Sequence, residues 1–248
     1  ERGRIMQERG IEGGMGAVIG LSDQQVDDIV DAAREHGEIS VANANAPGQI
    51  VLSGVIPALV FALEMSKTVG ARKAARLAVS VASHSPLMRR ARDEFGRILT
   101  LVPFRDPQVQ MLGNVHGTVI STADGLRTEL TEHLVHGVQW TTTVRHMVAD
   151  GVTDFVEVGP GRVLSGLIRR ISPEAPAMTS PTRTRTRRRT AALVLLAPMA
   201  VAGLVDQRRA CRAPHPGCLP ARRRGGHPVA AGPVRGLLPR SVPGADGG

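Results

Sequence analysis

Residues 14–80 carry the pattern that most narrows the possible folds, because short apolar runs and helical stretches alternate there in a fixed order. The runs predicted as strands are residues 16–21, 38–45, 49–54 and 75–80. One helix is predicted after the first strand and another after the third. The resulting βαββαβ order is typical of a ferredoxin-like subdomain.

Residues with defined roles at helix ends and turns mark the boundaries of these elements. Ser22 and Gln25 stand three residues apart, which predicts a capping box at the start of the first helix. The dipeptide Pro47-Gly48 is typical of a turn between two strands. Pro57 suits the first turn of the second helix, and Gly70 suits its end.

From residue 85 onward, helices alternate with single strands. Helices are predicted over residues 86–99, 124–137, 140–151 and 163–171, and strands over residues 109–115 and 153–161. A parallel sheet normally has more than two strands and helices on both faces. We therefore expect an α/β fold whose sheet is incomplete, as in a chain that lacks an amino-terminal part.

Residues 179–248 differ from the rest of the chain in composition. From residue 180 onward there are 13 arginines, no lysine and two acidic residues, in a chain with a formal net charge of +9. The residues before position 180 therefore carry a formal net charge close to zero. This segment predicts a basic disordered tail, produced by a frameshift after about Met178 or by a natural coding sequence. Its apolar run over residues 191–205 is too short to favour a membrane span.

Composition excludes some functions. The chain contains four Phe, one Trp and no Tyr, which argues against nucleic-acid modules that stack bases on aromatic rings. Cys211 and Cys218 are the only cysteines, and they lack the spacing of a zinc site. Because the residues before the tail contain no cysteine, they need no oxidising compartment, and we expect a cytoplasmic protein.

The residues alone give little support for two possible ligand sites. The segment G-P-G-R-V-L-S-G (159–166) resembles a dinucleotide-binding turn, but Leu164 stands where the third glycine is required. A tight strand-to-helix turn is favoured, although its helix amino terminus is able to attract an anion. No cysteine or paired carboxylate completes a metal site with four histidines, which helical spacing predicts to be solvated: His116, His133, His136 and His146.

His84 lies between Ser83 and Ser85, where a strand is expected to give way to a helix. On the residues alone, it is either a catalytic base or a polar residue at the start of that helix. A serine hydrolase would carry its nucleophile on a G-x-S-x-G turn, and no serine of this sequence has that context.

Six segments together resemble the malonyl-CoA:acyl carrier protein transacylase family. They are RGRIMQ (2–7), ANANAPGQIVLSG (42–54), SHSPLM (83–88), FRDPQV (104–109), VQW (138–140) and FVEVGPGRVLSGL (155–167), and they stand in the family's order. The resemblance implies a partial α/β-hydrolase-like acyltransferase domain (residues 1–13 and 81–178) with an inserted ferredoxin-like (βαββαβ) subdomain (residues 14–80).

The resemblance also implies a reaction. A malonyl group passes from coenzyme A to acyl carrier protein through an acyl-serine intermediate, in fatty-acid or polyketide synthesis. Malonyl-CoA is the substrate and no cofactor is required. The residues "VASH" that end at His84 do not decide between malonyl and methylmalonyl groups.

Individual residues take roles from the resemblance. His84 matches the general base, which takes the proton of the serine hydroxyl and returns one to the leaving thiol. Arg2 matches the arginine that pairs with the malonyl carboxylate, and Met6 lines the same pocket. A backbone carbonyl at about His133 orients the histidine ring, so the His133 side chain is expected to matter little.

The family's nucleophile and oxyanion loop precede the R-G segment and lie outside this chain. We therefore expect that this polypeptide alone transfers no malonyl group. Two alternatives stay open on the sequence. One is a non-catalytic binder of an acidic partner, acyl carrier protein or nucleic acid, through the retained surface or the Arg-rich tail. The other is a membrane-associated protein that uses residues 191–205.

Overall fold

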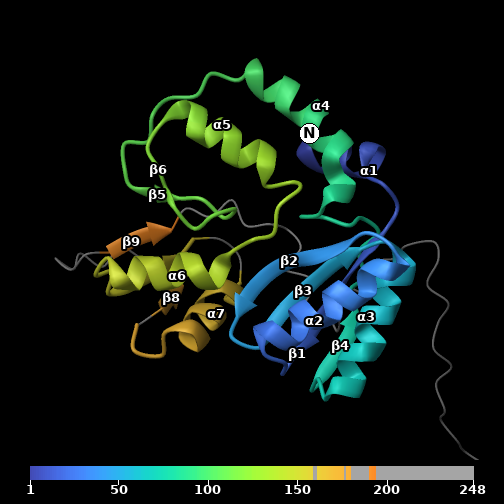
Figure 1. The fold of residues 1–248 in the computed structure, drawn as a ribbon. Coiled ribbons are helices and arrows are strands. Elements are labelled where there is room, and N and C mark those ends of the chain that lie inside the picture. Colours follow the sequence, from blue (N-terminus) through green and yellow to red (C-terminus); the bar gives the residue numbers. More distant parts are fainter. Residues whose placement is uncertain (159–160, 176, 180–189, 194–248) are drawn as a thin grey trace, which may run out of the picture. The chain divides into compact units, whose positions relative to one another are not determined.

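The computed structural model describes residues 1–158, 161–175, 177–179 and 190–193. Its first sheet has four strands: β1 (Gly14–Ile19), β2 (Ile39–Ala46), β3 (Gln49–Gly54) and β4 (Lys73–Arg76). The spatial order is β2-β3-β1-β4, and all neighbouring strands are antiparallel. With α2 (Asp23–Ala33) and α3 (Ile56–Val69), the predicted βαββαβ order is confirmed (Figure 1).

Local chemistry sets the ends of these two helices. The Ser22 hydroxyl accepts a hydrogen bond from the Gln25 amide at 3.2 Å, and the Gln25 side chain accepts one from the Ser22 amide at 2.9 Å. The predicted capping box is therefore present. A short 3-10 helix, η1 (Arg34–His36), follows α2 before Gly37. Gly70 ends α3 with a φ of 102°, a conformation that glycine adopts without steric cost.

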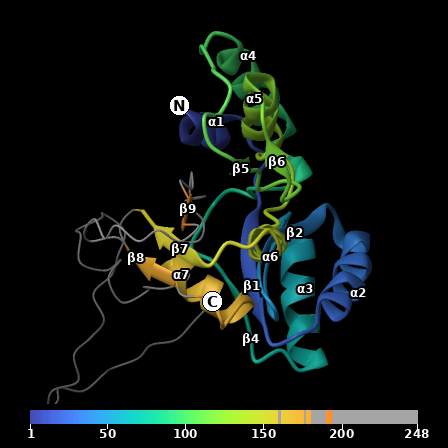
Figure 2. The ribbon, with the colours of Figure 1, turned by 90° about the vertical axis from the view of Figure 1, so that its left-hand side faces the viewer.

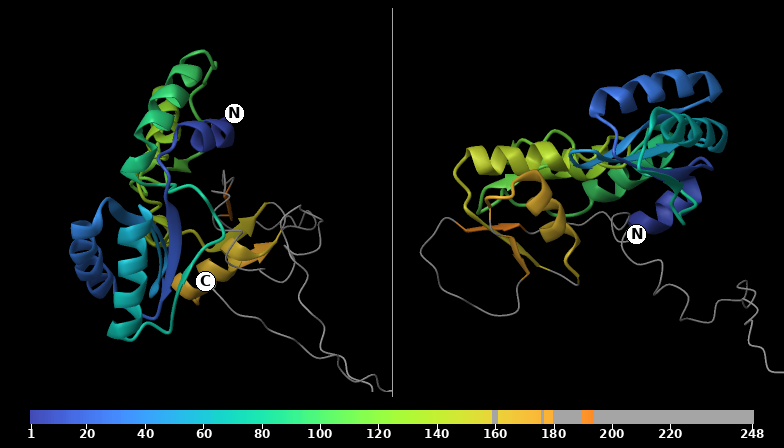
Figure 3. Two further views of the ribbon diagram at one scale, coloured as in Figure 1. Left: turned by 90° about the vertical axis from the view of Figure 1, so that its right-hand side faces the viewer. Right: turned by 90° about the horizontal axis from the view of Figure 1, so that it is seen from below.

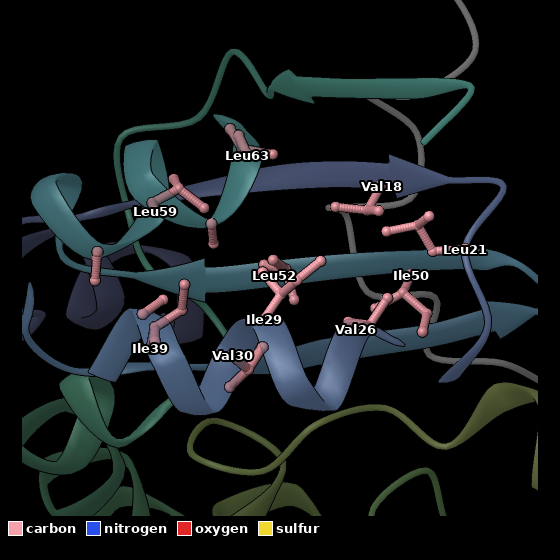
Figure 4. Close-up of a cluster of buried hydrophobic side chains, with 13 residues drawn as sticks. Val18, Leu21, Val26, Ile29, Val30, Ile39, Ile50, Leu52, Leu59 and Leu63 are labelled. Carbon is pink, nitrogen blue, oxygen red and sulfur yellow. The ribbon is translucent and has the colours of Figure 1, made fainter. Parts of the chain in front are cut away.

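Both helices cover the same face of the four-stranded sheet (Figure 3). Between them and the sheet lies a core built almost entirely from aliphatic side chains. Ile29 and Val30 of α2 face Leu52 of β3 in this core (Figure 4). The near absence of aromatic residues is thus compatible with a filled core, because branched aliphatic side chains interdigitate well between helices and strands.

The last strand of this sheet departs from the prediction. A strand was expected over residues 75–80, but β4 spans Lys73–Arg76. It ends there because its partner β1 begins at Gly14, so the ladder closes soon after Gly16 pairs with Arg76. The apolar residues that follow β4 lead the chain toward His84 instead of extending the strand.

A second group of helices contains α1 (Arg2–Arg9), η2 (Pro86–Met88), α4 (Arg89–Thr100) and α5 (Ala123–Glu132). Ile5 and Met6 of α1 pack with Met88, Phe95 and Leu134 in one buried cluster. The strand predicted over residues 109–115 is reduced to β5 (Met111–Leu112), which pairs with β6 (Val119–Ile120) in an antiparallel hairpin. The pattern missed β6 because a two-residue strand has no periodicity.

The third group contains α6 (Trp140–Ala149), α7 (Val163–Ile171) and a parallel sheet. In that sheet β7 (Asp154–Glu157) lies between β8 (Ala177–Thr179) and β9 (Thr190–Leu193), as Figure 2 shows for β7 and β8. The sequence predicted only the first of these three strands. Backbone hydrogen bonds join this group to β2, since the Val138 amide donates to Ala42 at 2.8 Å.

Part of the predicted tail can be compared with the structure. Thr190–Leu193, which fall inside the segment predicted to be disordered, form β9. Thr179, the first residue of that segment, ends β8. The remaining residues of the segment, including Cys211, Cys218 and most of the apolar run, lie outside the described residues. Across the residues that are described, no helix is long and apolar enough to cross a membrane.

Candidate active site

His84 lies in the connection between β4 and η2, and its backbone φ is 59°. This left-handed conformation costs a residue with a β-carbon about 1 kcal/mol, so surrounding contacts must hold it in place. The next residue supplies one of them, because the Ser85 hydroxyl donates to the Ala82 carbonyl at 2.6 Å. The His84 side chain is only 2% exposed.

The imidazole of His84 is oriented by the chain just after α5. Its Nδ1 lies 2.7 Å from the carbonyl oxygen of His133. Because a carbonyl oxygen only accepts, Nδ1 must carry the proton, and in the neutral ring Nε2 then holds a free lone pair. This arrangement fixes the ring in the tautomer that can accept a proton at Nε2.

The side chain of His133 packs against the same ring. The two ring centroids are 4.7 Å apart with an interplanar angle of 53°, and His133 is 6% exposed. Its Nε2 is buried and has no hydrogen-bond partner among the described residues. The expectation of a solvated His133 is therefore wrong. Helical spacing did not reveal this, because α5 itself has no buried residue and His133 follows its last turn.

The other three histidines do not join this site. His116 and His136 are exposed, and His146 Nδ1 lies 2.8 Å from the Gly117 carbonyl oxygen. No group of three or more histidines, cysteines or carboxylates suited to a metal ion occurs in the part of the chain that the structure describes.

Arg2 contributes a partly buried cationic group from α1. Its Nη2 is buried without a hydrogen-bond partner among the described residues, and burial lowers the pKa of its guanidinium. Arg4, two residues along the same helix, pairs instead with Glu1 and Glu8 at 2.5 Å each. Met6 is 7% exposed and packs in the same cluster as Met88, the last residue of η2.

Electrostatics favour a neutral His84. Burial, followed by the nearby positive charge of Arg2, lowers the pKa of His84 to about 4, although hydrogen bonds of the ring with the backbone of His133 and His136 partly oppose this. Burial, His84 and Arg2 lower the pKa of His133 to about 3. Near pH 7 both rings are therefore neutral, and His84 can act as a proton acceptor.

The amino terminus of α7 is not free to bind an anion, in contrast to what its sequence suggested. The Glu157 carboxylate accepts hydrogen bonds from the Leu164 amide at 3.2 Å and from the Ser165 amide at 2.9 Å. The Ser165 hydroxyl donates to the same carboxylate at 2.7 Å. This carboxylate at the end of β7 supplies the negative charge that the helix terminus attracts.

Two asparagines of β2 were not singled out in the sequence. Asn43 and Asn45 are each 1% exposed, and their Nδ2 atoms have no partner among the described residues. Asn43 forms an isolated parallel bridge with Val138 in the V-Q-W segment. The signal was available, because polar side chains at alternate positions of an otherwise apolar strand are unusual.

Comparison with known proteins gives a consistent result. No family model matches the chain. A malonyl CoA-acyl carrier protein transacylase of Escherichia coli (strain K12) is 40% identical over 172 residues, which is 68% of this chain and 56% of that protein. The chain is related to the malonyl CoA-acyl carrier protein transacylases. It spans about 56% of the length of this relative.

Other relatives widen the range of pathways. The malonyl CoA-acyl carrier protein transacylase of Bacillus subtilis (strain 168) is 34% identical over 69% of this chain and 55% of its own length. A polyketide biosynthesis malonyl CoA-acyl carrier protein transacylase of the same organism is 36% identical over 67% of this chain and 57% of its own length. A transacylase named for polyketide biosynthesis is thus similar to this chain, as are transacylases whose names give no pathway.

Solved structures confirm the fold class. The malonyl-CoA:acyl carrier protein transacylase of Xanthomonas oryzae has a TM-score of 0.69 and 39% identity, over 72% of this chain and 57% of its own. A malonyl-transacylase solved with its type II polyketide acyl-carrier protein has a TM-score of 0.70 and 36% identity, over 72% and 59% of the two chains. This chain therefore holds part of an α/β-hydrolase-like acyltransferase fold.

Proposed function

We propose that this chain carries the histidine and arginine part of a site that transfers a malonyl group from coenzyme A to acyl carrier protein. The observation that carries the proposal is the position of His84. Its Nδ1 is held by the His133 carbonyl at 2.7 Å, its Nε2 is left to accept a proton, and Arg2 supplies an unpartnered guanidinium nearby. The names of the relatives supply the reaction.

In this proposal His84 is the general base. The Nε2 lone pair takes the proton of a serine hydroxyl as that oxygen attacks the thioester carbonyl carbon, and the resulting imidazolium then protonates the leaving thiol of coenzyme A. The hydrogen bond from Nδ1 to a carbonyl stabilises the charged ring during the step. The second half-reaction repeats the sequence with the phosphopantetheine thiol of acyl carrier protein.

Arg2 selects the acyl group. A guanidinium can hold a carboxylate through two parallel hydrogen bonds, and Arg2 is available because its Nη2 has no partner among the described residues. Met6, buried in the neighbouring cluster, presents a flexible apolar side chain to the same region. An acyl group without a carboxylate would leave the buried guanidinium unpaired, which disfavours its binding.

The sequence does not contain the nucleophile of the proposed reaction, because no serine stands in a G-x-S-x-G context. We therefore propose that the chain alone forms no acyl-enzyme. The reaction as written requires no resident cofactor beyond malonyl-CoA as a substrate. Its substrates and the lack of cysteine before residue 211 favour a cytoplasmic location.

A fusion protein tests the function. The segment of the Escherichia coli transacylase that carries its nucleophilic serine is joined in frame before Glu1, and malonyl transfer to acyl carrier protein is measured. We expect transfer by the fusion and none by the chain alone. In the fusion, the variant Arg2→Ala should lose selectivity for malonyl-CoA over acetyl-CoA, with Arg4→Ala as the matched control. A selectivity that Arg2→Ala leaves unchanged would contradict the role of Arg2.

A second candidate function rests on charge. The 13 arginines between residues 180 and 248 would attract an acidic partner such as acyl carrier protein or nucleic acid without catalysis. Binding of the full chain to acyl carrier protein would then fall steeply with salt, and deletion of residues 180–248 would remove this dependence. A salt dependence that survives the deletion would rule out the tail as the binding element.

A further inference from the structure

His133 carries an unexplained polar atom next to the proposed base. Its carbonyl already serves His84, but its imidazole also lies against the His84 ring with a centroid distance of 4.7 Å. The Nε2 of this imidazole is buried and unpartnered among the described residues, as is the Nη2 of Arg2. A buried donor without a partner costs about 1–3 kcal/mol, so two of them around one ring need an explanation.

Within the described part of the chain, no acidic side chain near His133 supplies the missing acceptor. Glu129, one turn earlier on α5, accepts hydrogen bonds from the Asn114 and Val115 amides at 2.5 and 3.2 Å. Glu132 lies 3.9 Å from Arg92 and 3.3 Å from His136. The charged groups that act on His133 are His84, from the connection after β4, and Arg2, from α1. Among the described residues, the groups that act on the His133 imidazole are therefore cationic or neutral. The ligand that complements them is an anion.

We propose that the His133 imidazole is a substrate-recognition group, whose Nε2–H and the Nη2 of Arg2 together bind the carboxylate of an acyl substrate beside His84. The inference rests on the proposed function and deepens it, since it adds the His133 side chain to the groups that select an acyl group ending in a carboxylate. Substrate specificity then depends on the His133 side chain as well as on its carbonyl, contrary to the expectation from the sequence.

The chemistry requires only hydrogen bonds and no proton transfer to the ligand. In the tautomer with hydrogen on Nε2, the neutral ring donates one hydrogen bond to a carboxylate oxygen, and the guanidinium donates to the carboxylate as well. A bound anion also opposes the positive charge of Arg2, so it raises the pKa values of both imidazoles. An acetyl group satisfies neither donor, and the site therefore rejects it.

Binding of free malonate to the full chain tests the proposal, with 15N-labelled histidine observed by NMR and the dissociation constant measured by calorimetry. His133→Phe keeps a ring and the backbone carbonyl but removes the donor, and should weaken malonate binding by roughly 10-fold or more. His133→Gln, which restores an N–H, should recover most of the affinity. His136→Phe, the same change at an exposed position three residues away, should have no effect. Circular dichroism establishes that each variant is folded.

The outcomes separate the inference from the proposed function. Malonate should shift the His133 Nε2 resonance in the wild-type chain, and Arg2→Ala should abolish this shift. If His133→Phe binds malonate within twofold of wild type while Arg2→Ala does not bind it, the inference is wrong and the role of Arg2 stands. If the wild-type chain does not bind malonate, the inference is also wrong, whereas malonyl transfer by the fusion protein still decides the proposed function.

Discussion

At the scale of residues, His84 is held from several directions at once. Its left-handed backbone, the Ser85 to Ala82 hydrogen bond and the His133 carbonyl together leave the ring one orientation. The sequence suggested His84 through its resemblance, but it could not predict the burial of His133. That burial depends on a contact between segments 49 residues apart, which local periodicity does not encode.

The two buried histidines predict a specific response to acid. Their pKa values of about 4 and about 3 in the folded chain lie below the ordinary value of 6.5, so between these limits the unfolded chain binds more protons. Stability contributed by neutral burial is complete above about pH 6.5 and is lost as the pH falls toward 4 and then 3. Urea unfolding at pH 7.5 and pH 4.5 should show this loss, at about 1.4 kcal/mol for each pKa unit.

Urea unfolding of variants at the same two pH values separates the contribution of the histidines from that of the carboxyl groups, which also change protonation in acid. His133→Phe should lose less stability than wild type between the two pH values. His116→Phe, at an exposed position, should follow the wild-type dependence. Equal losses for His133→Phe and wild type would show that His133 is not buried in its neutral form.

At the scale of elements, the features that depend on short-range interactions were predictable from the sequence. The Ser22 to Gln25 capping box, the αL glycine at position 70 and the strand Gln49–Gly54 all follow from short-range chemistry and were all confirmed. The strands β6, β8 and β9 were missed because each has only two to four residues, which is too few for a periodic pattern.

The capping box of α2 should contribute measurably to stability. Ser22→Ala removes the acceptor for the Gln25 amide, and should lower the free energy of unfolding by about 1 kcal/mol. Ser22→Asp retains an acceptor and should remain close to wild type. Urea denaturation of the three proteins measures the difference. A Ser22→Ala protein as stable as wild type would mean that the cap is replaced by solvent at no cost.

The aliphatic core between the helices and the four-stranded sheet should contribute more to the free energy of unfolding than the capping box does. Leu52 of β3 is fully buried there, so Leu52→Ala removes apolar contacts and leaves a cavity that costs about 2–5 kcal/mol. Leu101 is 83% exposed and gives the matched control, since Leu101→Ala should change stability by less than about 0.5 kcal/mol. Similar unfolding midpoints for the two variants would argue against this core.

At the scale of the whole molecule, the composition of the chain changes near residue 180. The relatives match about 70% of the chain, and the Arg-rich composition begins at residue 180. The ferredoxin-like order was predictable from pattern, and the α/β fold class from pattern and resemblance together. The parallel sheet was not, because β8 and β9 were not predicted as strands. The domain boundaries at residues 13, 80 and 178 stay predictions. Backbone hydrogen bonds join β2, inside the predicted subdomain, to Val138, which lies outside it.

We propose that His84 is the general base for malonyl transfer. The rate of the fusion protein, measured with and without the His84 imidazole, tests this role. His84→Ala in the fusion should reduce malonyl transfer to acyl carrier protein by about 10²–10⁴-fold. The exposed His136→Ala serves as the control and should retain the full rate. A fusion that transfers malonyl groups equally well with His84 and with alanine at that position would contradict the account.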